Sequence, residues 1–152
     1  VFDGVAQGES PEQIADALGL SRGVSGYINH TVPMAVGCWL AHRQDGENAY
    51  RAAVESAVAL GGDSDTVAAI TGALAGAEHG ADAIPLDWLA GLSEWPTTKR
   101  WIASLADALT RRVQGESVER IPRVNAFAVL LRNVGFTAIV LAQGLRRLLP
   151  PY

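Results

Sequence analysis

The sequence predicts an all-α protein, and three observations support that fold class. Long segments place apolar residues at helical spacing, as Tyr50, Ala53 and Ala57 do. Alternation of apolar and polar residues never persists long enough to predict a strand, and no repeat period appears. No linker is long or biased enough to divide the chain, so we expect residues 1–152 to belong to a single all-α domain.

The composition indicates a mildly acidic protein large enough for a sizeable core. Apolar residues make up 49% of the 152 residues and charged residues 18%, with a net charge of -4. We therefore expect no nucleic acid and no membrane as docking partner, because both attract basic surfaces. The single cysteine, Cys38, cannot form an internal disulfide and favours a reducing compartment, which predicts a cytoplasmic location.

The first half of the chain contains clear start and stop signals for helices. Ser10, Pro11 and Gln13 together predict a capped helix that runs to about Leu18. Residues 19–33 hold three glycines and no sustained helical period, which predicts a loop or a short extended piece. A second helix is expected from Pro33 to residue 42, and a third from Glu47 to the glycine pair at 61–62.

The segment after Thr66 consists almost entirely of small residues and is predicted to be a helix ending at Gly80. Glycines recur in it every four residues, at Gly72, Gly76 and Gly80. Because glycine costs about 1 kcal/mol relative to alanine inside a helix, we expect a neighbouring helix to approach closely there. This predicts a helix buried on several sides at the centre of a bundle.

Further helices are predicted after Gly80. One begins at Ile84-Pro85, another at Pro96, and one or two apolar helices cover residues 124–149. The apolar stretch 134–145 is shorter than the roughly 20 residues that a membrane span needs, so we expect a buried helix there.

The chemistry of the chain is concentrated in the motif Gly61-Gly62-Asp63-Ser64-Asp65-Thr66, which lies between two predicted helices. Asp63 and Asp65 can direct two carboxylates to one side of a glycine-led turn, with the Thr66 hydroxyl beside them. Close carboxylates repel unless a cation or hydrogen bonds relieve them, and oxygen-only ligands suit magnesium or calcium. The pattern therefore predicts part of a magnesium site.

Two other interpretations of the motif stay open. Either aspartate could simply N-cap the following helix, where the dipole favours negative charge. The Asp-x-Asp pattern also fits haloacid-dehalogenase-like phosphatases, in which Asp63 would be the nucleophile. That fold needs a strand leading into the motif, whereas the alanine-rich lead-in here favours a helix.

Residues 60–77, followed by Gly80 and Ile84-Pro85, resemble the C-terminal metal motif of the ADP-ribosylglycohydrolase family. Residues 26–31 and Ala35 resemble the segment that precedes this motif in the family, so the resemblance covers roughly residues 25–88. It implies a compact all-α multi-helix bundle with two magnesium ions, and it places Asp63, Asp65 and Thr66 among the metal ligands. The substrate contacts implied by the resemblance are Ser25, Gly26, Tyr27, His30, Thr31 and Ser64. It identifies no catalytic base.

The resemblance implies magnesium-dependent hydrolysis of an ADP-ribosyl glycosidic bond, in an ADP-ribosylated protein or a small ADP-ribose derivative. The family's N-terminal part, with a Gly-Asp-x-x-Gly turn and a Thr-Asp-Asp-Thr cluster, has no counterpart in this sequence. We therefore expect residues 1–152 to be the C-terminal part of one domain, inactive alone and completed by an N-terminal half in the same polypeptide or in a second chain. The alternative is a non-enzymatic relative, a helical ADP-ribose-binding or structural module.

Overall fold

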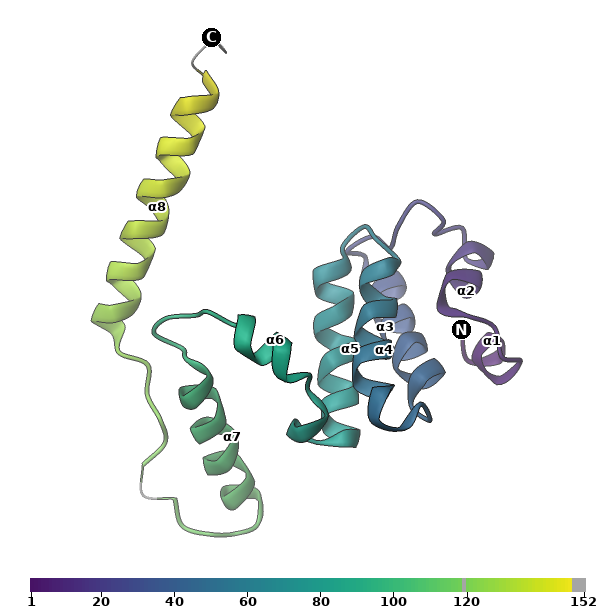
Figure 1. Cartoon of the computed structure of the whole chain (residues 1–152), viewed down its shortest axis with the longest axis horizontal. Helices are drawn as coiled ribbons and strands as arrows, with labels where there is room; N and C mark the ends of the chain where they lie inside the picture. Colours follow the sequence, from purple (N-terminus) through teal and green to yellow (C-terminus); the bar gives the residue numbers. More distant parts are fainter. Residues whose placement is uncertain (119, 149–152) are drawn as a thin grey trace. The chain divides into compact units, whose positions relative to one another are not determined.

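A computed structural model describes residues 1–118 and 120–148, and its named elements in these ranges are all helices, which confirms the all-α class (Figure 1). The chain divides into two compact units, Val1–Trp88 and Leu89–Tyr152. The α-helices of the described ranges are α1 Phe2–Ala6, α2 Pro11–Ala17, α3 Ile28–His42, α4 Ala49–Ala59, α5 Ser64–His79, α6 Leu86–Gly91, α7 Lys99–Val113 and α8 Ala126–Leu148. Short 3-10 turns, η1 Gly46–Asn48 and η2 Ala81–Ala83, precede α4 and α6.

Helix α2 begins as predicted, with Ser10 as its N-cap. The Gln13 backbone N–H donates to the Ser10 hydroxyl at 3.3 Å, and the Ser10 backbone N–H donates to the Gln13 side chain at 2.8 Å. This reciprocal pair satisfies two backbone donors that the first turn would otherwise leave unpaired. Helix α1 was not predicted, since five residues give too short a periodic pattern.

Helix α3 begins at Ile28, five residues before the predicted start, so the predicted loop over 19–33 is too long at its end. Pro33 is the sixth residue of the helix, so the Asn29 carbonyl lacks the i+4 N–H that would normally donate to it. The helix is held by burial of Thr31, Met34 and Cys38 rather than by local propensity. The prediction from Pro33 was wrong because tertiary packing outweighed weak helix formers in the first turn.

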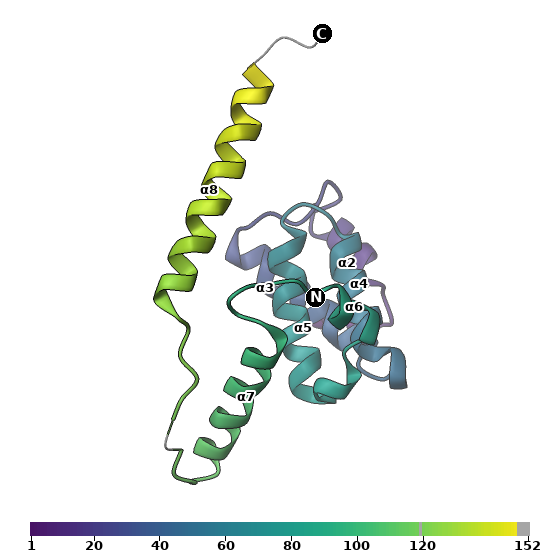
Figure 2. The ribbon, with the colours of Figure 1, turned by 60° about the vertical axis from the view of Figure 1, so that its left-hand side comes forward.

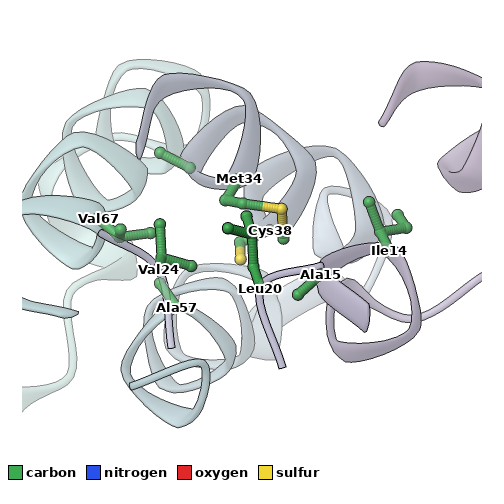
Figure 3. Close-up of a cluster of buried hydrophobic side chains, with 9 residues drawn as sticks. Ile14, Ala15, Leu20, Val24, Met34, Cys38, Ala57 and Val67 are labelled. Carbon is green, nitrogen blue, oxygen red and sulfur yellow. The ribbon is translucent and has the colours of Figure 1, made fainter. Parts of the chain in front are cut away.

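The core of the first unit lies where α2, α3, α4 and α5 meet. Helices α3, α4 and α5 pack against one another side by side, as Figures 1 and 2 show. Figure 3 shows the buried side chains that fill the space between them, with Met34 and Cys38 of α3 pointing toward Val24 and Leu20. The buried cluster comprises Ile14, Ala15, Leu20, Val24, Met34, Ala35, Cys38, Ala57 and Val67.

The small residues of α5 allow the close approach that the sequence predicts. A Cβ atom at Gly72 would lie 3.2 Å from the Tyr50 hydroxyl oxygen, and one at Gly76 would lie 3.6 Å from the Tyr50 ring. Tyr50 of α4 therefore sits directly against these glycines. Gly80 has another role, since its φ of +81° ends α5.

The prediction that α5 is buried on several sides is wrong for the residues that the structure describes. Its buried residues, Val67, Thr71 and Ala75, recur every four positions and form a single face toward α3 and α4. Another stripe of α5, formed by Ala69, Ala73 and Ala77, is exposed. Small residues alone do not reveal how many faces of a helix are covered.

The second unit contains α7 and α8. The Thr98 hydroxyl caps α7 by accepting a hydrogen bond from the Trp101 backbone N–H at 3.3 Å. The apolar stretch 134–145 lies in α8, where the expected burial is wrong: Val134 is 60% exposed and Leu141 is 62% exposed. A core helix needs partners, and among the described residues of this unit no other helix packs along α8 (Figures 1 and 2). The predicted helix end at Leu149 lies outside the described residues.

Met34 is completely buried in the first unit, so its truncation tests the assigned core. We expect Met34→Ala to lower the free energy of unfolding by about 2–5 kcal/mol, because it removes buried contacts and leaves a cavity. Leu86→Ala, at an 82% exposed position, should stay within about 0.5 kcal/mol of the parent. Urea denaturation of both variants measures the difference, and equal losses would contradict this core.

Candidate functional site

The acidic motif lies in the turn between α4 and α5. Gly61 and Gly62 have φ values of +67° and +73°, a conformation that residues with a Cβ atom rarely adopt. These two glycines reverse the chain after α4, and Asp63 becomes the N-cap residue of α5. The glycine-led turn between two helices that the sequence predicts is therefore present.

An isolated parallel bridge joins this turn to the loop before α3. The Val24 backbone N–H donates to the Gly61 carbonyl at 3.2 Å, and the Asp63 backbone N–H donates to the Val24 carbonyl at 2.7 Å. The two backbones are so close that a Cβ atom at Gly23 would lie 2.7 Å from the Gly62 nitrogen. Sequence reasoning did not identify this bridge, although the glycines on both segments signal a close backbone approach.

The side chain of Asp63 is not used as a helix cap. Among the described residues its carboxylate accepts no capping hydrogen bond, and its Oδ1 accepts instead from the Thr66 hydroxyl at 2.9 Å. Its Oδ2 faces the loop, 2.8 Å from where a Cβ atom at Gly26 would be. Simple capping by Asp63 therefore does not explain the motif. The phosphatase alternative fails as well, because the segment leading into the motif is helix α4.

The two carboxylates and the threonine form one hydrogen-bonded group. Asp65 Oδ1 accepts from the Thr66 backbone N–H at 2.9 Å. Hydrogen bonding with the Asp63 carboxyl, and secondly with the Thr66 N–H, holds the pKa of Asp65 below its usual value. Asp65 therefore stays ionised at a lower pH than an ordinary aspartate.

The loop residues proposed to contact substrate lie next to this group. The Ser25 hydroxyl and His30 Nδ1 are 2.9 Å apart, and the Tyr27 and His30 rings meet edge to face at a centroid distance of 5.3 Å. Tyr27 is 57% exposed, whereas Thr31 is buried and donates its hydroxyl hydrogen bond to the Ser25 carbonyl at 2.9 Å. Thr31 thus anchors the loop to the buried side of α3, while Ser25 and Tyr27 are exposed and His30 is half-buried.

Two helices begin at this site. The bridge places the start of α3 at Ile28 close to the start of α5 at Ser64. Helix N-termini carry partial positive charge and backbone N–H groups without helical partners, so both favour an anion. The motif thus combines carboxylates that suit a cation with helix ends that suit a negatively charged ligand.

The site is open rather than enclosed. Asp65 and Thr66 are exposed, and two surface hollows of about 640 and 720 Å³ lie elsewhere on the first unit, lined by other residues. In the described ranges no three histidine, cysteine, aspartate or glutamate side chains come together as a metal cluster. The motif offers two carboxylates and a hydroxyl, whereas magnesium takes about six oxygen ligands.

The model of the ADP-ribosylglycohydrolase family matches residues 2–119. The chain is 39% identical over 85 residues to ADP-ribosylhydrolase ARH3 of Danio rerio, which covers 52% of this chain and 22% of the relative. It is 34% identical over 83 residues to the protein of that name from Homo sapiens, which covers 51% of this chain and 22% of the relative. A match of 39% over 57 residues to the Xenopus tropicalis protein covers 38% of this chain and 16% of the relative. The matched stretches thus span about a fifth of these relatives, and no solved structure matches.

Proposed function

The chain belongs to the ADP-ribosylglycohydrolase family, and from that premise we propose that it contributes to a magnesium-dependent site that hydrolyses an ADP-ribosyl glycosidic bond. The observation that carries this proposal is the bridge between Val24 and Gly62. It holds the loop of Tyr27 and His30 beside the carboxylates of Asp63 and Asp65, so metal ligands and substrate contacts would share one surface.

The donor set fits magnesium. Asp63, Asp65 and Thr66 would hold the ion through hard oxygen atoms, which is the ligand type that magnesium prefers. The Asp63 carboxylate, which the helix does not use as a cap, supports this role. When bound, magnesium would act as a Lewis acid and orient the oxygen atoms of the substrate.

The loop and the helix ends would bind the nucleotide. Tyr27 offers an exposed aromatic ring, and Ser25 holds His30 by a side-chain hydrogen bond. The N-termini of α3 and α5 would attract the diphosphate of ADP-ribose, since each presents unpaired N–H groups and a positive dipole end. Ser64, the first residue of α5, lies where its hydroxyl or N–H could contribute to the same contact.

A complementary segment would complete the metal site. The motif supplies about half of the oxygens that magnesium needs. The exposed alanine stripe of α5, Ala69, Ala73 and Ala77, begins one turn after the motif and offers a flat surface for another helix. We propose that a segment carrying further oxygen ligands packs there, from the same polypeptide or from a second chain, and that this assembly works in the cytoplasm.

Hydrolysis can be tested on the protein purified under native conditions from its own cells, so that any complementary segment is retained. ADP-ribosylated arginine, ADP-ribosylated serine peptides and O-acetyl-ADP-ribose would be incubated with it, and free ADP-ribose would be measured. We expect turnover of at least one substrate, loss of turnover with EDTA, and recovery with magnesium. ADP-ribose binding without turnover of any substrate would support the non-enzymatic alternative instead.

A further inference from the structure

Residues 25–31, which lead into α3, form a hydrogen-bond network of their own. The buried Thr31 hydroxyl donates to the Ser25 carbonyl at 2.9 Å and also contacts the Tyr27 carbonyl at 3.3 Å. The Tyr27 backbone N–H donates to the Ser25 hydroxyl oxygen at 3.3 Å. The Asn29 amide donates to the Tyr27 hydroxyl oxygen at 2.9 Å. Hydrogen bonds within the chain thus order this exposed loop, which lowers the entropy that a ligand must remove on binding.

The Ser25 hydroxyl fixes which nitrogen of the His30 ring carries the hydrogen. A hydroxyl has one hydrogen to donate, and its oxygen can also accept. The Ser25 oxygen accepts from the Tyr27 N–H, and among the described residues the one acceptor at hydrogen-bond distance is His30 Nδ1, at 2.9 Å. Because Nδ1 accepts this hydrogen bond, the hydrogen of the neutral ring lies on Nε2.

His30 Nε2 is the side of the ring that is open to a ligand. Within the described residues Nε2 makes no hydrogen bond, and it is not among the buried polar atoms that lack a partner. The Tyr27 ring meets the His30 ring at an interplanar angle of 86°, an edge-to-face contact that restricts the plane of the imidazole. The neutral ring therefore presents an N–H donor in a fixed orientation.

This donor lies in a site that has few other means of binding an anion. His30 is the third residue of α3, and the bridge between Val24 and Gly62 brings the start of α5 nearby. Residues 23–42 and 52–98 contain no lysine and no arginine. An anion beside the carboxylates of the motif is repelled unless a cation or hydrogen-bond donors offset the charge. The N–H groups of the loop and of the helix ends therefore have to supply those donors.

We propose that Ser25 is a positioning residue that holds His30 as an Nε2–H donor, and that this N–H donates to a diphosphate oxygen of ADP-ribose. The ligand in this proposal rests on the proposed function, whereas the role of Ser25 rests on the hydrogen bonds of the loop. The other tautomer would present a lone pair to the diphosphate, which repels it. A hydrogen bond to a charged oxygen is roughly twice as strong as one between neutral groups. Ser25 would thus act through His30 rather than by touching the substrate, as the resemblance implied.

The role of Ser25 is tested by nitrogen NMR of the full chain with isotope-labelled histidine, without ligand or magnesium, at about pH 8, where an ordinary histidine is neutral. The chain has three histidines, and His30→Gln identifies the His30 signals by removing them. We expect the hydrogen on Nε2 in the parent. In Ser25→Ala the Nδ1 signal should move, because Nδ1 loses its donor, and Ser25→Thr should restore the parent signal. A hydrogen on Nδ1 in the parent, or unchanged His30 signals in Ser25→Ala, would overturn the positioning role.

The donor is tested by calorimetric titration of the natively purified protein and its variants with ADP-ribose in the presence of magnesium. His30→Gln places an amide near the position of Nε2, whereas His30→Asn places one near Nδ1. We expect His30→Asn to weaken binding at least about tenfold, Ser25→Ala about three- to tenfold, and His30→Gln less than about threefold. His42→Gln, at the other end of α3, is the matched control and should bind as the parent does.

Two outcomes of the titration would contradict the proposal. Equal losses in His30→Asn and His30→Gln would show that Nε2 does not donate to the ligand. A parent protein that binds no ADP-ribose would overturn both this ligand contact and the proposed function. The NMR signals of Ser25→Ala separate these failures, because they report the role of Ser25 in the absence of any ligand.

Discussion

Replacing Asp63 with alanine should abolish the response of the protein to magnesium. A ligand that binds only the folded state raises the melting temperature as its concentration rises, so magnesium should stabilise the parent protein. The Asp63 carboxylate is held toward the loop by the Thr66 hydroxyl and does not cap α5, so its loss should remove the ion rather than unfold the helix. We expect no melting shift with magnesium, and a hydrolytic rate lower by at least about a hundredfold.

The matched control is Asp82→Ala. Asp82 is exposed in η2 of the same unit, and its replacement removes the same charge without touching the motif. Gly26→Ala provides a second probe, because its Cβ atom would lie 2.8 Å from Asp63 Oδ2 and displace that carboxylate without removing it. Melting curves with magnesium and with EDTA measure all three variants. If magnesium still raises the melting temperature of Asp63→Ala, Asp63 is not a ligand of the metal.

Local signals in the sequence predicted the fold class and the position of the motif. The Ser10 cap, the glycine pair before Asp63 and the small residues facing Tyr50 each act over a few residues, so a one-dimensional pattern reveals them. The start of α3 was missed, because burial of Met34 and Cys38 decides it, and burial depends on elements distant in the sequence.

The juxtaposition at the site is a long-range property. The bridge between Val24 and Gly62 joins segments 38 residues apart, and no local pattern predicts which loop lies beside the motif. The resemblance to the family suggested that both segments belong to one site, and the structure brings them together. The basic character of the second unit could not be predicted from the overall composition. The net charge of -4 averages a strongly acidic first unit with a basic second unit.

Gly62→Ala should be among the most damaging single substitutions in the first unit. Its φ of +73° costs a residue with a Cβ atom about 1–2 kcal/mol. The added Cβ atom would also collide with the Val24 carbonyl oxygen and lie 2.7 Å from the Val24 nitrogen. Backbone atoms cannot swing aside as a side chain can, so the bridge must open. We expect a loss of more than about 3 kcal/mol in the free energy of unfolding by urea denaturation.

Gly61→Ala separates the two causes of this loss. Gly61 has a similar φ of +67°, but within the described residues no atom lies within 4 Å of an added Cβ atom. The free energy of unfolding of this variant should fall only by the cost of a positive φ for a residue with a Cβ atom, about 1–2 kcal/mol. Its melting temperature should still rise with magnesium. Gly62→Ala should also lose that response, because opening the bridge releases the loop from Asp63. Equal destabilisation of the two variants would mean that the bridge contributes little, and the loop and the motif would then need another contact to hold them together.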